Sequence, residues 1–515
     1  MAEGAHNQAL DVQGEEYDIV ILGSGFSGLC MAIKLKEAGI SSFIMLEKSN
    51  DVGGTWRENT YPGCACDVQS HLYSYSFEPN PDWTKSYPGG KEIQEYILRC
   101  TEKYNLRPSI RFNSEVKDAT FDETNARWSI RTSNGTLYKA KSFIMGSGPL
   151  HVPSIPSIRG LDTFKGKVFH SAQWDHSYDL KGKNVVSIGT GGSAIQYVPE
   201  IAPDVKQLYV FQRTPAWILP RFESRYSNFR KKLFRRIPLF RKLHRARLYF
   251  SNEIRVLPIY NPTFAKFLSN FAKWHIKSSL NDSSLVEKMT PDYTIGCKRV
   301  LISNKYYPAF NRDNVELVTD AVKEVKENSI VTQDGKERPI DAIILGTGFI
   351  TDPRIYMKDF TITGLNGRTL LQQWEKGAES YLGINVSGFP NLFQLVGPNT
   401  ALGHNSVIFM IECQVHYIIE SLTLLKKKNA RYMNLHQDAL ESFNQEIAAG
   451  LNDTVWSSGC SSWYTQDDGK NFTLWPGTTI KYRARTRRVI TEHYHWEGAD
   501  SGNNVSNTDI ATQVP

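Results

Sequence analysis

The sequence lacks paired cysteine motifs and long apolar runs. Its seven cysteines are scattered, with no CxxC pair and no histidine-rich tract that could bind zinc. No stretch approaches the about 18 uninterrupted apolar residues of a membrane-spanning helix, and the first residues lack the basic and then apolar pattern of a signal peptide. We therefore expect reduced thiols, no bound metal ion and a cytoplasmic location.

What the sequence contains is typical of a large globular protein. The chain has 515 residues, of which 40% are hydrophobic and 22% are charged. At roughly 150 residues a domain, this length predicts about three domains. Length and composition together exclude a single small binding module and a disordered or fibrous chain.

Positive charge is concentrated in one segment. Residues 221–250 hold eleven lysines and arginines and a single acid, Glu223, so the segment carries +10 in a chain whose net charge is +7. Leucine, isoleucine and phenylalanine alternate with these charges, as in a basic amphipathic helix interrupted by Pro238. Weak contact with a membrane surface is one interpretation. We favour a solvated helical face near a phosphate-bearing ligand, and we expect no nucleic acid, because no known reader motif accompanies the charges.

Two segments have the pattern of a strand, a glycine-rich turn and a helix. The predicted strands lie at 17–22 and 184–188. The small residues of the turns are Gly23, Gly25 and Gly28 in the first unit, and Gly189, Gly191 and Ala194 in the second. Such residues allow a tight turn, close approach of the backbone to a pyrophosphate, and close packing of helix on strand. The sequence therefore predicts two dinucleotide-binding folds in one chain.

The end of the second strand of each unit predicts which nucleotide it binds. Glu47 lies nineteen residues after Gly28, where a carboxylate can accept hydrogen bonds from ribose hydroxyls, as FAD or NAD requires. Arg213 lies nineteen residues after Ala194 and is followed by Thr214, a pair that suits the 2′-phosphate of NADP. The alternative is that both charged residues are ordinary surface groups, and their equal offset favours the functional interpretation.

Two more apolar strands, near 142–148 and 341–349, end in small residues and are typical of crossings between an FAD domain and an inserted NADP domain. The fold class is therefore α/β, with two Rossmann-like dinucleotide-binding domains and a helical insertion. The predicted boundaries are 1–150 and 346–515 for the FAD-binding domain, 151–219 and 295–345 for the NADP-binding domain, and 220–294 for the insertion.

Two motifs carry a family resemblance. Phe164, Gly166, His170 and Trp174, followed by Asp175, match the FxGxxxHxxxW fingerprint of the type I Baeyer–Villiger monooxygenases. The composition of this chain predicts such a match by chance about once in a thousand sequences. The run from Gly53 to Asp67 resembles the GGxW…YPGxxxD loop of the same family, and the similarity extends over residues 16–490.

The resemblance implies an NADPH- and O2-dependent flavoprotein monooxygenase. Such an enzyme inserts one oxygen atom next to a ketone carbonyl through a flavin peroxide, and it releases an ester or lactone. Its partners would be a small-molecule ketone and O2, with FAD and NADP as cofactors, and we expect a monomer or a loose dimer. An S- or N-oxidising flavin-containing monooxygenase remains the alternative, although those relatives usually lack the tryptophan at position 174.

More distant alternatives also remain open. A thioredoxin-reductase-type flavoprotein would need a dithiol pair, which the sequence does not show. A catalytically idle scaffold or membrane-surface protein built on this fold has only the basic segment 221–250 in its favour.

The resemblance also implies roles for individual residues. Arg299 would be the active-site arginine, which stabilises negative charge on the activated oxygen, and Asp67 would orient it. We expect His170 to be a hinge or hydrogen-bonding residue rather than a proton carrier. The residues expected to bind the cofactors are Gly23, Gly25, Gly28, Glu47, Lys48, Gly54, Thr55, Trp56, Asp67, Gly189, Gly191, Ala194, Gln196, Arg213, Thr214, Lys298 and Asn399.

Overall fold

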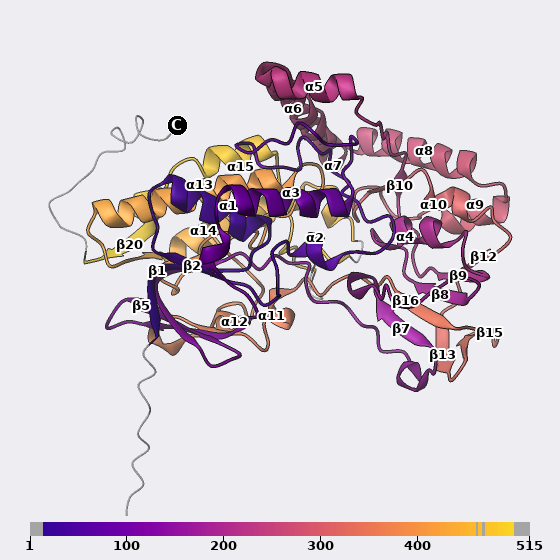
Figure 1. Ribbon diagram of the computed structural model, residues 1–515, viewed down its shortest axis with the longest axis horizontal. Coiled ribbons are helices and arrows are strands. Elements are labelled where there is room, and N and C mark those ends of the chain that lie inside the picture. The colour runs from indigo at the N-terminus through magenta and orange to yellow at the C-terminus, as the bar shows by residue number, and fades with distance from the viewer. Residues whose placement is uncertain (1–13, 460–461, 466–468, 499–515) are drawn as a thin grey trace, which may run out of the picture.

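The computed structural model describes residues 14–459, 462–465 and 469–498, and its strands form two large sheets that lie at opposite ends of the view (Figure 1). The first sheet has eight strands. In spatial order they are β17 (Thr361–Thr363), β4 (Val116–Asp122), β5 (Arg127–Thr132), β6 (Leu137–Met145), β1 (Glu15–Leu22), β2 (Phe43–Leu46) and β3 (Ile110–Arg111), with β18 (Leu392–Gln394) also paired to β6. The contacts among β1, β2, β3 and β6 are parallel, whereas β4, β5 and β6 pair antiparallel.

Helices from both ends of the chain pack with this sheet. The predicted glycine turn leads from β1 into α1 (Phe26–Glu37), which contacts the long helix α13 (Val407–Lys427). Both contribute to the largest apolar core of the molecule. The other helices of this part are α2 (Thr55–Glu58), α3 (Gly90–Lys103), α11 (Pro353–Tyr356), α12 (Leu370–Gln373), α14 (Gln437–Asn452) and α15 (Thr479–Arg485).

The second sheet is fully parallel. Its order is β12 (Val315–Val318), β9 (Gln207–Phe211), β8 (Asn184–Ile188), β16 (Ala342–Leu345) and β7 (Lys167–His170). The second glycine turn leads from β8 into α4 (Ala194–Ile201), which packs with α10 (Tyr306–Ala309). The two strand, turn and helix units are therefore present where the sequence predicts them, and the two predicted crossings are β6 and β16.

A run of helices separates β10 (Ile218–Leu219) from β11 (Leu301–Ile302), two strands that pair in parallel at its base. The helices are α5 (Asn228–Arg236), α6 (Pro238–Glu253), η4 (Ile254–Val256), α7 (Leu257–Tyr260), α8 (Pro262–Ser279) and α9 (Ser283–Met289). Pro238 opens α6 and thereby divides the basic segment into two helices, as predicted. In Figure 1, α5 and α6 stand out from the body along the upper edge of the view.

The remaining elements are short. They are β13 (Val322–Lys326), β14 (Ser329–Thr332), β15 (Glu337–Pro339), β19 (Tyr432–Leu435), β20 (Tyr494–Glu497), η1 (Arg107–Ser109), η2 (Leu161–Thr163), η3 (Ser171–Gln173), η5 (Leu365–Gly367), η6 (Val455–Ser457) and η7 (Thr491–His493).

One helix in the described part of the chain, α13, is long and apolar enough to cross a membrane. Eleven of its 21 residues are buried, and it packs against α1. The helix therefore has the surroundings of a core helix of the first sheet.

The expectation of reduced thiols throughout is wrong at one position. Cys30, Cys64, Cys66, Cys100 and Cys413 are free, but Cys297 is in a disulfide. The sequence could not show this, because a disulfide depends on how close two chain segments come in space.

Candidate cofactor and active site

In the glycine turn after β1, the backbone of Gly28 lies directly against that of Gly23. Gly23 has φ +90°, and a Cβ atom added to Gly28 would lie 1.9 Å from the Gly23 carbonyl oxygen. A Cβ added to Gly54 would lie 3.3 Å from the Cα of Gly25, so two glycine loops face each other closely here. Because α1 begins at the next residue, Phe26, its free N–H groups lie beside this gap. The arrangement fits the pyrophosphate of FAD, which binds at such helix N-termini.

Adding one methyl group to Gly28 is expected to disrupt this turn. Because the new Cβ would overlap a backbone oxygen that cannot move away, Gly28→Ala should lower the free energy of unfolding by about 1–3 kcal/mol and reduce the bound flavin. Gly191→Ala is the matched control, since no atom lies within 4 Å of its added Cβ. Thermal unfolding and the flavin-to-protein absorbance ratio measure both effects. A Gly28→Ala protein that melts and binds flavin like the wild type would contradict the prediction.

Glu47 lies at the end of β2 and is almost fully buried. One carboxylate oxygen accepts hydrogen bonds from the backbone N–H and the hydroxyl of Ser24, both at 2.8 Å, and the other accepts from the N–H of Ser49 at 2.9 Å. Glu47 therefore fixes the glycine turn, and it keeps acceptor capacity for a ribose hydroxyl because a carboxylate has about four lone-pair positions.

The turn after β8 has a similar construction. Gly189 has φ +105°, and a Cβ there would lie 2.4 Å from the carbonyl oxygen of Gly346. Ala194 fills the third position of the motif, and its Cβ would lie 3.4 Å from a Cβ added to Gly346, which indicates close packing of α4 on β16. The space beside Gly191 is open, as a site for a second pyrophosphate requires. Thr214 follows β9, and its carbonyl oxygen accepts a hydrogen bond from the hydroxyl of Thr190 in this turn.

Lys298 and Arg213 lie close enough to influence each other electrostatically. Burial lowers the pKa of Lys298, and the positive charge of Arg213 lowers it further. The ammonium group of Lys298 also lies over the ring of Tyr293, 4.8 Å from its centroid. Two like charges held near each other beside the second nucleotide unit form a site suited to an anion such as the 2′-phosphate of NADP.

Asp67 and Arg299, which are 232 residues apart in the chain, form an ion pair. A guanidinium nitrogen of Arg299 donates to Oδ2 of Asp67 at 2.5 Å. Burial opposes ionisation of the carboxyl group, but the Arg299 charge holds the pKa of Asp67 below its usual value. In turn, Asp67 raises the pKa of Arg299, so the guanidinium is a permanent cation. The side chains keep 45% and 28% exposure for Arg299 and Asp67, so a small molecule can reach the pair.

Two tyrosine side chains lie near this ion pair. Tyr464 is buried and lies near both charges, and burial raises its pKa to about 12, so its hydroxyl stays protonated. Tyr73 also lies near both charges, and its hydroxyl accepts a hydrogen bond from the indole N–H of Trp56 at 3.2 Å. Trp56 and Thr55 belong to α2, the short helix that follows Gly54. We call residues 61–73 the Asp67 loop. The hydrogen bond from Trp56 to Tyr73 thus joins this loop to the turn at Gly54.

Gln196 connects the second nucleotide unit to the Asp67 loop. Its side-chain carbonyl accepts from the Tyr61 hydroxyl at 2.9 Å and from the N–H of Ala65 at 3.2 Å. Its amide nitrogen donates to the carbonyl oxygen of Ala65 at 3.0 Å. Gln196 of α4 therefore holds the chain before Asp67 by two hydrogen bonds to Ala65 and one to Tyr61.

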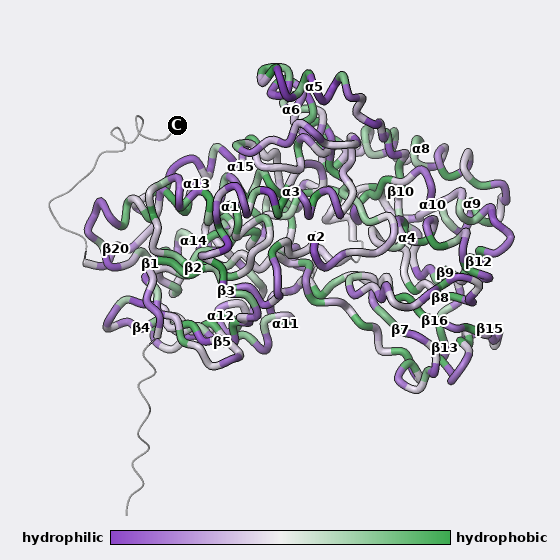
Figure 2. Tube along the Cα trace, viewed as in Figure 1, coloured by the Kyte–Doolittle hydropathy of each residue, from purple (hydrophilic) through white to green (hydrophobic). Residues whose placement is uncertain are grey.

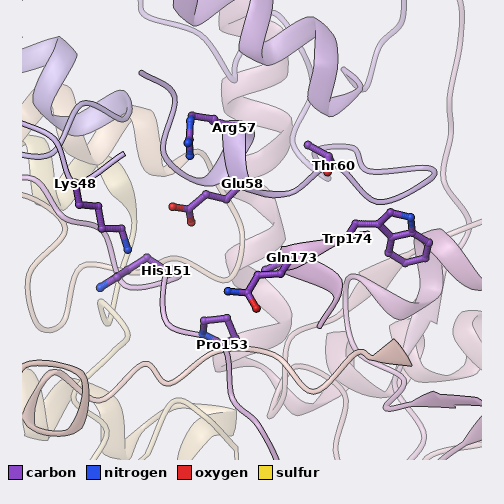
Figure 3. Close-up of a pocket in the computed structure, with 9 residues that line it drawn as sticks. Lys48, Arg57, Glu58, Thr60, His151, Pro153, Gln173 and Trp174 are labelled. Carbon is purple, nitrogen blue, oxygen red and sulfur yellow. The ribbon is translucent and has the colours of Figure 1, made fainter. Parts of the chain in front are cut away.

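A pocket of about 470 Å³ opens between the first unit and the fingerprint segment (Figure 3). Its lining side chains are mostly polar or charged. They are Lys48, Arg57, Glu58, Thr60, His151, Pro153, Ala172, Gln173 and Trp174. The pocket therefore includes the residue after Glu47 and the tryptophan of the fingerprint.

Two titratable groups of this pocket have shifted pKa values. Burial, together with the nearby charge of Lys48, lowers the pKa of His151 to about 4. Burial raises the pKa of Glu58, while Lys48 and Arg57 oppose that change. Figure 3 shows the Lys48 and His151 side chains pointing toward each other. The Glu58 side chain enters the same pocket from α2.

The fingerprint residues form the junction between the second sheet and the pocket. His170 ends β7, is buried, and accepts a hydrogen bond from the N–H of Ala172 through Nδ1. Burial lowers its pKa, so it is neutral near pH 7. Trp174 packs edge-on to Phe169 and tilted against Tyr197, with ring centroids 5.1 and 5.5 Å apart. These contacts pack the fingerprint segment against β7 and α4.

Asn399 lies in a loop of the C-terminal part with φ +59°. Its amide group donates to the carbonyl oxygens of Asn471 and Leu474 at 2.9 and 3.1 Å. The Asn399 side chain therefore ties its own loop to the backbone of residues 471–474.

The sequence alone did not single out several residues of this site. Tyr464 and Arg221 both lie near the Asp67 carboxylate, and Glu58 projects into the pocket. Glu58 had one available signal, its place inside the GGxW…YPGxxxD loop. Arg221 was visible only as part of the basic segment and Tyr464 had no signal, because only the tertiary fold brings them to Asp67.

Comparisons with known proteins agree with this geometry. A family model described as flavin-binding monooxygenase-like matches residues 16–248. A Baeyer–Villiger monooxygenase of Pseudomonas aeruginosa is 46% identical over 480 residues, which cover 93% of this chain and 91% of the relative. A Baeyer–Villiger monooxygenase of Streptomyces coelicolor is 44% identical over 484 residues, which cover 93% and 92% of the two chains.

Solved structures that resemble this chain over most of its length are also monooxygenases. A steroid monooxygenase bound to NADP superimposes with a TM-score of 0.84 at 29% identity, covering 94% of this chain and 99% of the other. Cyclohexanone monooxygenase from Rhodococcus sp. Phi1, bound to NADP+, gives 0.85 at 27% identity and covers 94% and 100%. The chain belongs to the Baeyer–Villiger monooxygenases, and it is an NADPH-dependent FAD enzyme of that family.

Proposed function

We propose that this enzyme inserts one atom of O2 between the carbonyl carbon of a small-molecule ketone and a neighbouring carbon, giving an ester or a lactone. The observation that carries the proposal is the Asp67–Arg299 pair, an accessible fixed cation near Tyr464 and Tyr73, and Tyr73 accepts a hydrogen bond from Trp56 beside Gly54. When bound, FAD reduced by NADPH supplies the activated oxygen that is transferred.

Arg299 acts as the catalytic cation in this proposal. Its guanidinium is always charged, so it stabilises negative charge that develops on oxygen during the transfer without a change in its own protonation. Asp67 positions the guanidinium through the 2.5 Å hydrogen bond. Gln196 holds the loop that carries Asp67, and buried neutral His170 supports the hinge rather than moving a proton.

The remaining site residues divide between the two nucleotides. Gly23, Gly25, Gly28, Glu47 and Lys48, with Gly54, Thr55 and Trp56 of the facing loop, hold FAD, and Asn399 stabilises the loops nearby. Gly189, Gly191, Ala194 and Thr214 hold NADP, with Arg213 and Lys298 on its 2′-phosphate. This division rests on the glycine turns and on the charge pair described above.

The domain boundaries follow the same division. We assign 1–150 and 346–515 to FAD binding, 151–219 and 295–345 to NADP binding, and 220–294 to the insertion. In support, β17 and β18 pair with strands of the first sheet, and β16 pairs with β7 and β8 of the second. The enzyme works in the cytoplasm as a monomer or loose dimer, which size-exclusion chromatography with light scattering tests.

The test of the function is direct product analysis. The purified yellow protein is supplied with NADPH, ¹⁸O2 and a panel of cyclic, linear and steroid ketones, and mass spectrometry detects the products. Cyclic and steroid ketones head the panel because structural relatives are named for cyclohexanone and for a steroid. We expect an ester or lactone that carries one ¹⁸O atom, and much slower turnover with NADH. Oxygenation of sulfides or amines without any ester would instead support the heteroatom-oxidising alternative.

A further inference from the structure

Exposed apolar side chains are concentrated in the helical insertion. Of the 17 large hydrophobic residues that are exposed in the described part of the chain, 12 lie between positions 222 and 274. They are Phe222, Phe229, Ile237, Leu239, Leu243, Phe250, Ile254, Leu257, Tyr260, Phe264, Phe267 and Trp274. Single exposed apolar residues are normal, but this number within about a tenth of the chain indicates a surface that something covers.

The spacing of these residues places them on continuous helical faces. Leu239, Leu243 and Phe250 of α6 continue into Ile254 and Leu257, with steps of four, seven, four and three residues. The opposite face of α6 is the one that packs on the body of the protein, through buried residues such as His244 and Leu248. The apolar stripe of α6 therefore faces outward.

Helix α8 repeats the arrangement. Phe264, Phe267 and Trp274 follow at steps of three and seven residues and are 47–73% exposed, and exposed Tyr260 ends α7 just before this helix. The helix buries its other side through residues such as Ala272 and Ile276. In Figure 1, α8 lies along the same upper edge of the view as α5 and α6. We call the outward sides of α5, α6, α7 and α8 the insertion face.

Basic side chains accompany the apolar stripe. Exposed Lys242 and Arg247 lie on either side of the α6 stripe, and α5 adds exposed Lys232 and Arg236. Figure 2 shows hydrophobic and hydrophilic residues alternating along α5 and α6. Apolar residues with lysines and arginines at their edges are typical of helices that lie in the headgroup region of a membrane, because the long basic side chains reach the phosphates.

Charge decides between the candidate occupants of this face. A second copy of the chain would bring a +10 segment against an identical +10 segment, which is unfavourable. A surface of anionic phospholipid offers both groups that this face needs, namely phosphates for the basic residues and acyl chains for the apolar residues. We propose that the insertion face is a docking surface for an anionic lipid bilayer.

The same helix that presents the lipid-facing stripe also holds the active-site loop. Arg245 of α6 donates to the carbonyl oxygen of His71 at 2.5 Å, and Asn252 donates to the side chain of Gln69 at 2.9 Å. Both partners lie within four residues of Asp67. Docking through the insertion face thus brings the Asp67 loop close to the lipid surface.

Sedimentation of the holoenzyme with vesicles tests the proposal. One vesicle type is phosphatidylcholine alone, and the other contains one third phosphatidylglycerol. We expect binding to the anionic vesicles at 0.1 M salt and loss of most of it at 1 M salt, since the screening length falls from about 10 Å to about 3 Å. No binding to the anionic vesicles at 0.1 M salt would overturn the proposal, as would equal binding to both vesicle types.

Two variants separate the contributions to docking, and neither changes a residue of the cofactor site. Lys232→Ala, Arg236→Ala and Lys242→Ala together should weaken binding about tenfold to a hundredfold, since each charge near an anionic surface contributes roughly 1 kcal/mol. Leu239→Ser, Leu243→Ser and Phe250→Ser together should weaken it at least tenfold. Both should keep the wild-type melting temperature and NADPH oxidation rate, because the altered side chains are exposed.

Matched controls on other surfaces complete the experiment. Lys181→Ala, Lys206→Ala and Lys323→Ala remove the same charge, and Ile155→Ser, Ile355→Ser and Ile490→Ser remove exposed apolar groups elsewhere. Both controls should bind vesicles like the wild type. Equal losses in the control and test variants would overturn the proposal. So would light scattering that shows a dimer in the wild type and a monomer in the Leu239, Leu243 and Phe250 variant, because the face would then serve self-association.

Discussion

Replacing Arg299 with alanine is expected to reduce ester formation by about a hundredfold to a thousandfold, the usual cost of removing a fixed group that stabilises developing negative charge. Reduction of the bound flavin by NADPH should change far less, because the glycine turns and the Lys298–Arg213 pair remain. Stopped-flow reduction and chromatographic ester yield measure the two steps separately. Arg299→Lys should recover only part of the yield, since lysine keeps the charge but loses the planar fork.

Removal of Asp67 tests whether the two residues act as a unit. Asp67→Ala leaves the Arg299 charge in place but removes its 2.5 Å partner, so misplacement of the guanidinium should cost about a hundredfold in ester yield. The double variant should then be little worse than Arg299→Ala alone, because residues that act as a unit are not additive. Arg368→Ala, which removes an exposed arginine elsewhere, is the control. Near-normal ester formation by Arg299→Ala would show that the assigned role is wrong.

The sequence predicts those parts of the molecule that depend on local geometry. The strand, turn and helix units could be predicted because Gly28 and Gly189 lie against the carbonyl oxygens of Gly23 and Gly346, which leave no room for a side chain. The fingerprint and the Gly53–Asp67 loop were readable from family resemblance. The sequence also located the insertion, because its charge and amphipathic spacing depend only on neighbouring residues.

The sequence could not predict contacts that the tertiary fold creates. Gln196 bonds Ala65 across 131 residues of chain, and Tyr464 meets Arg299 from the C-terminal part. Amphipathic spacing also does not show which side of a helix faces the body. Spacing alone therefore does not show that the outward face of 221–250 carries apolar side chains beside its charges, as α6 does with Leu239 and Leu243.

Loss of Arg213 or Lys298 is expected to weaken recognition of the 2′-phosphate that distinguishes NADP from NAD. Arg213→Ala and Lys298→Ala should each weaken binding of 2′,5′-ADP about tenfold to a hundredfold, because a hydrogen bond to a charged group contributes roughly 1.5–3 kcal/mol. Binding of 5′-ADP, which lacks the 2′-phosphate, should be unaffected. Isothermal titration calorimetry measures both ligands, and Lys206→Ala is the control because this exposed lysine lies in the same sheet region. Equal losses for the two ligands would show that these residues do not recognise the phosphate.

The pKa of Lys298 offers a second, independent test of phosphate binding by Arg213 and Lys298, because the two cations repel each other. Because the charge of Arg213 lowers the pKa of Lys298, Arg213→Ala should raise that pKa toward its usual value. Binding of 2′,5′-ADP to the wild type should raise it as well, since the phosphate offsets the like charge. NMR titration of the Lys298 ammonium in ¹³C-methylated protein follows the shift, and Lys298→Arg identifies the signal by its loss. The pair should couple in a double-mutant cycle, because both residues bind one phosphate and neither can hold it in place as firmly alone.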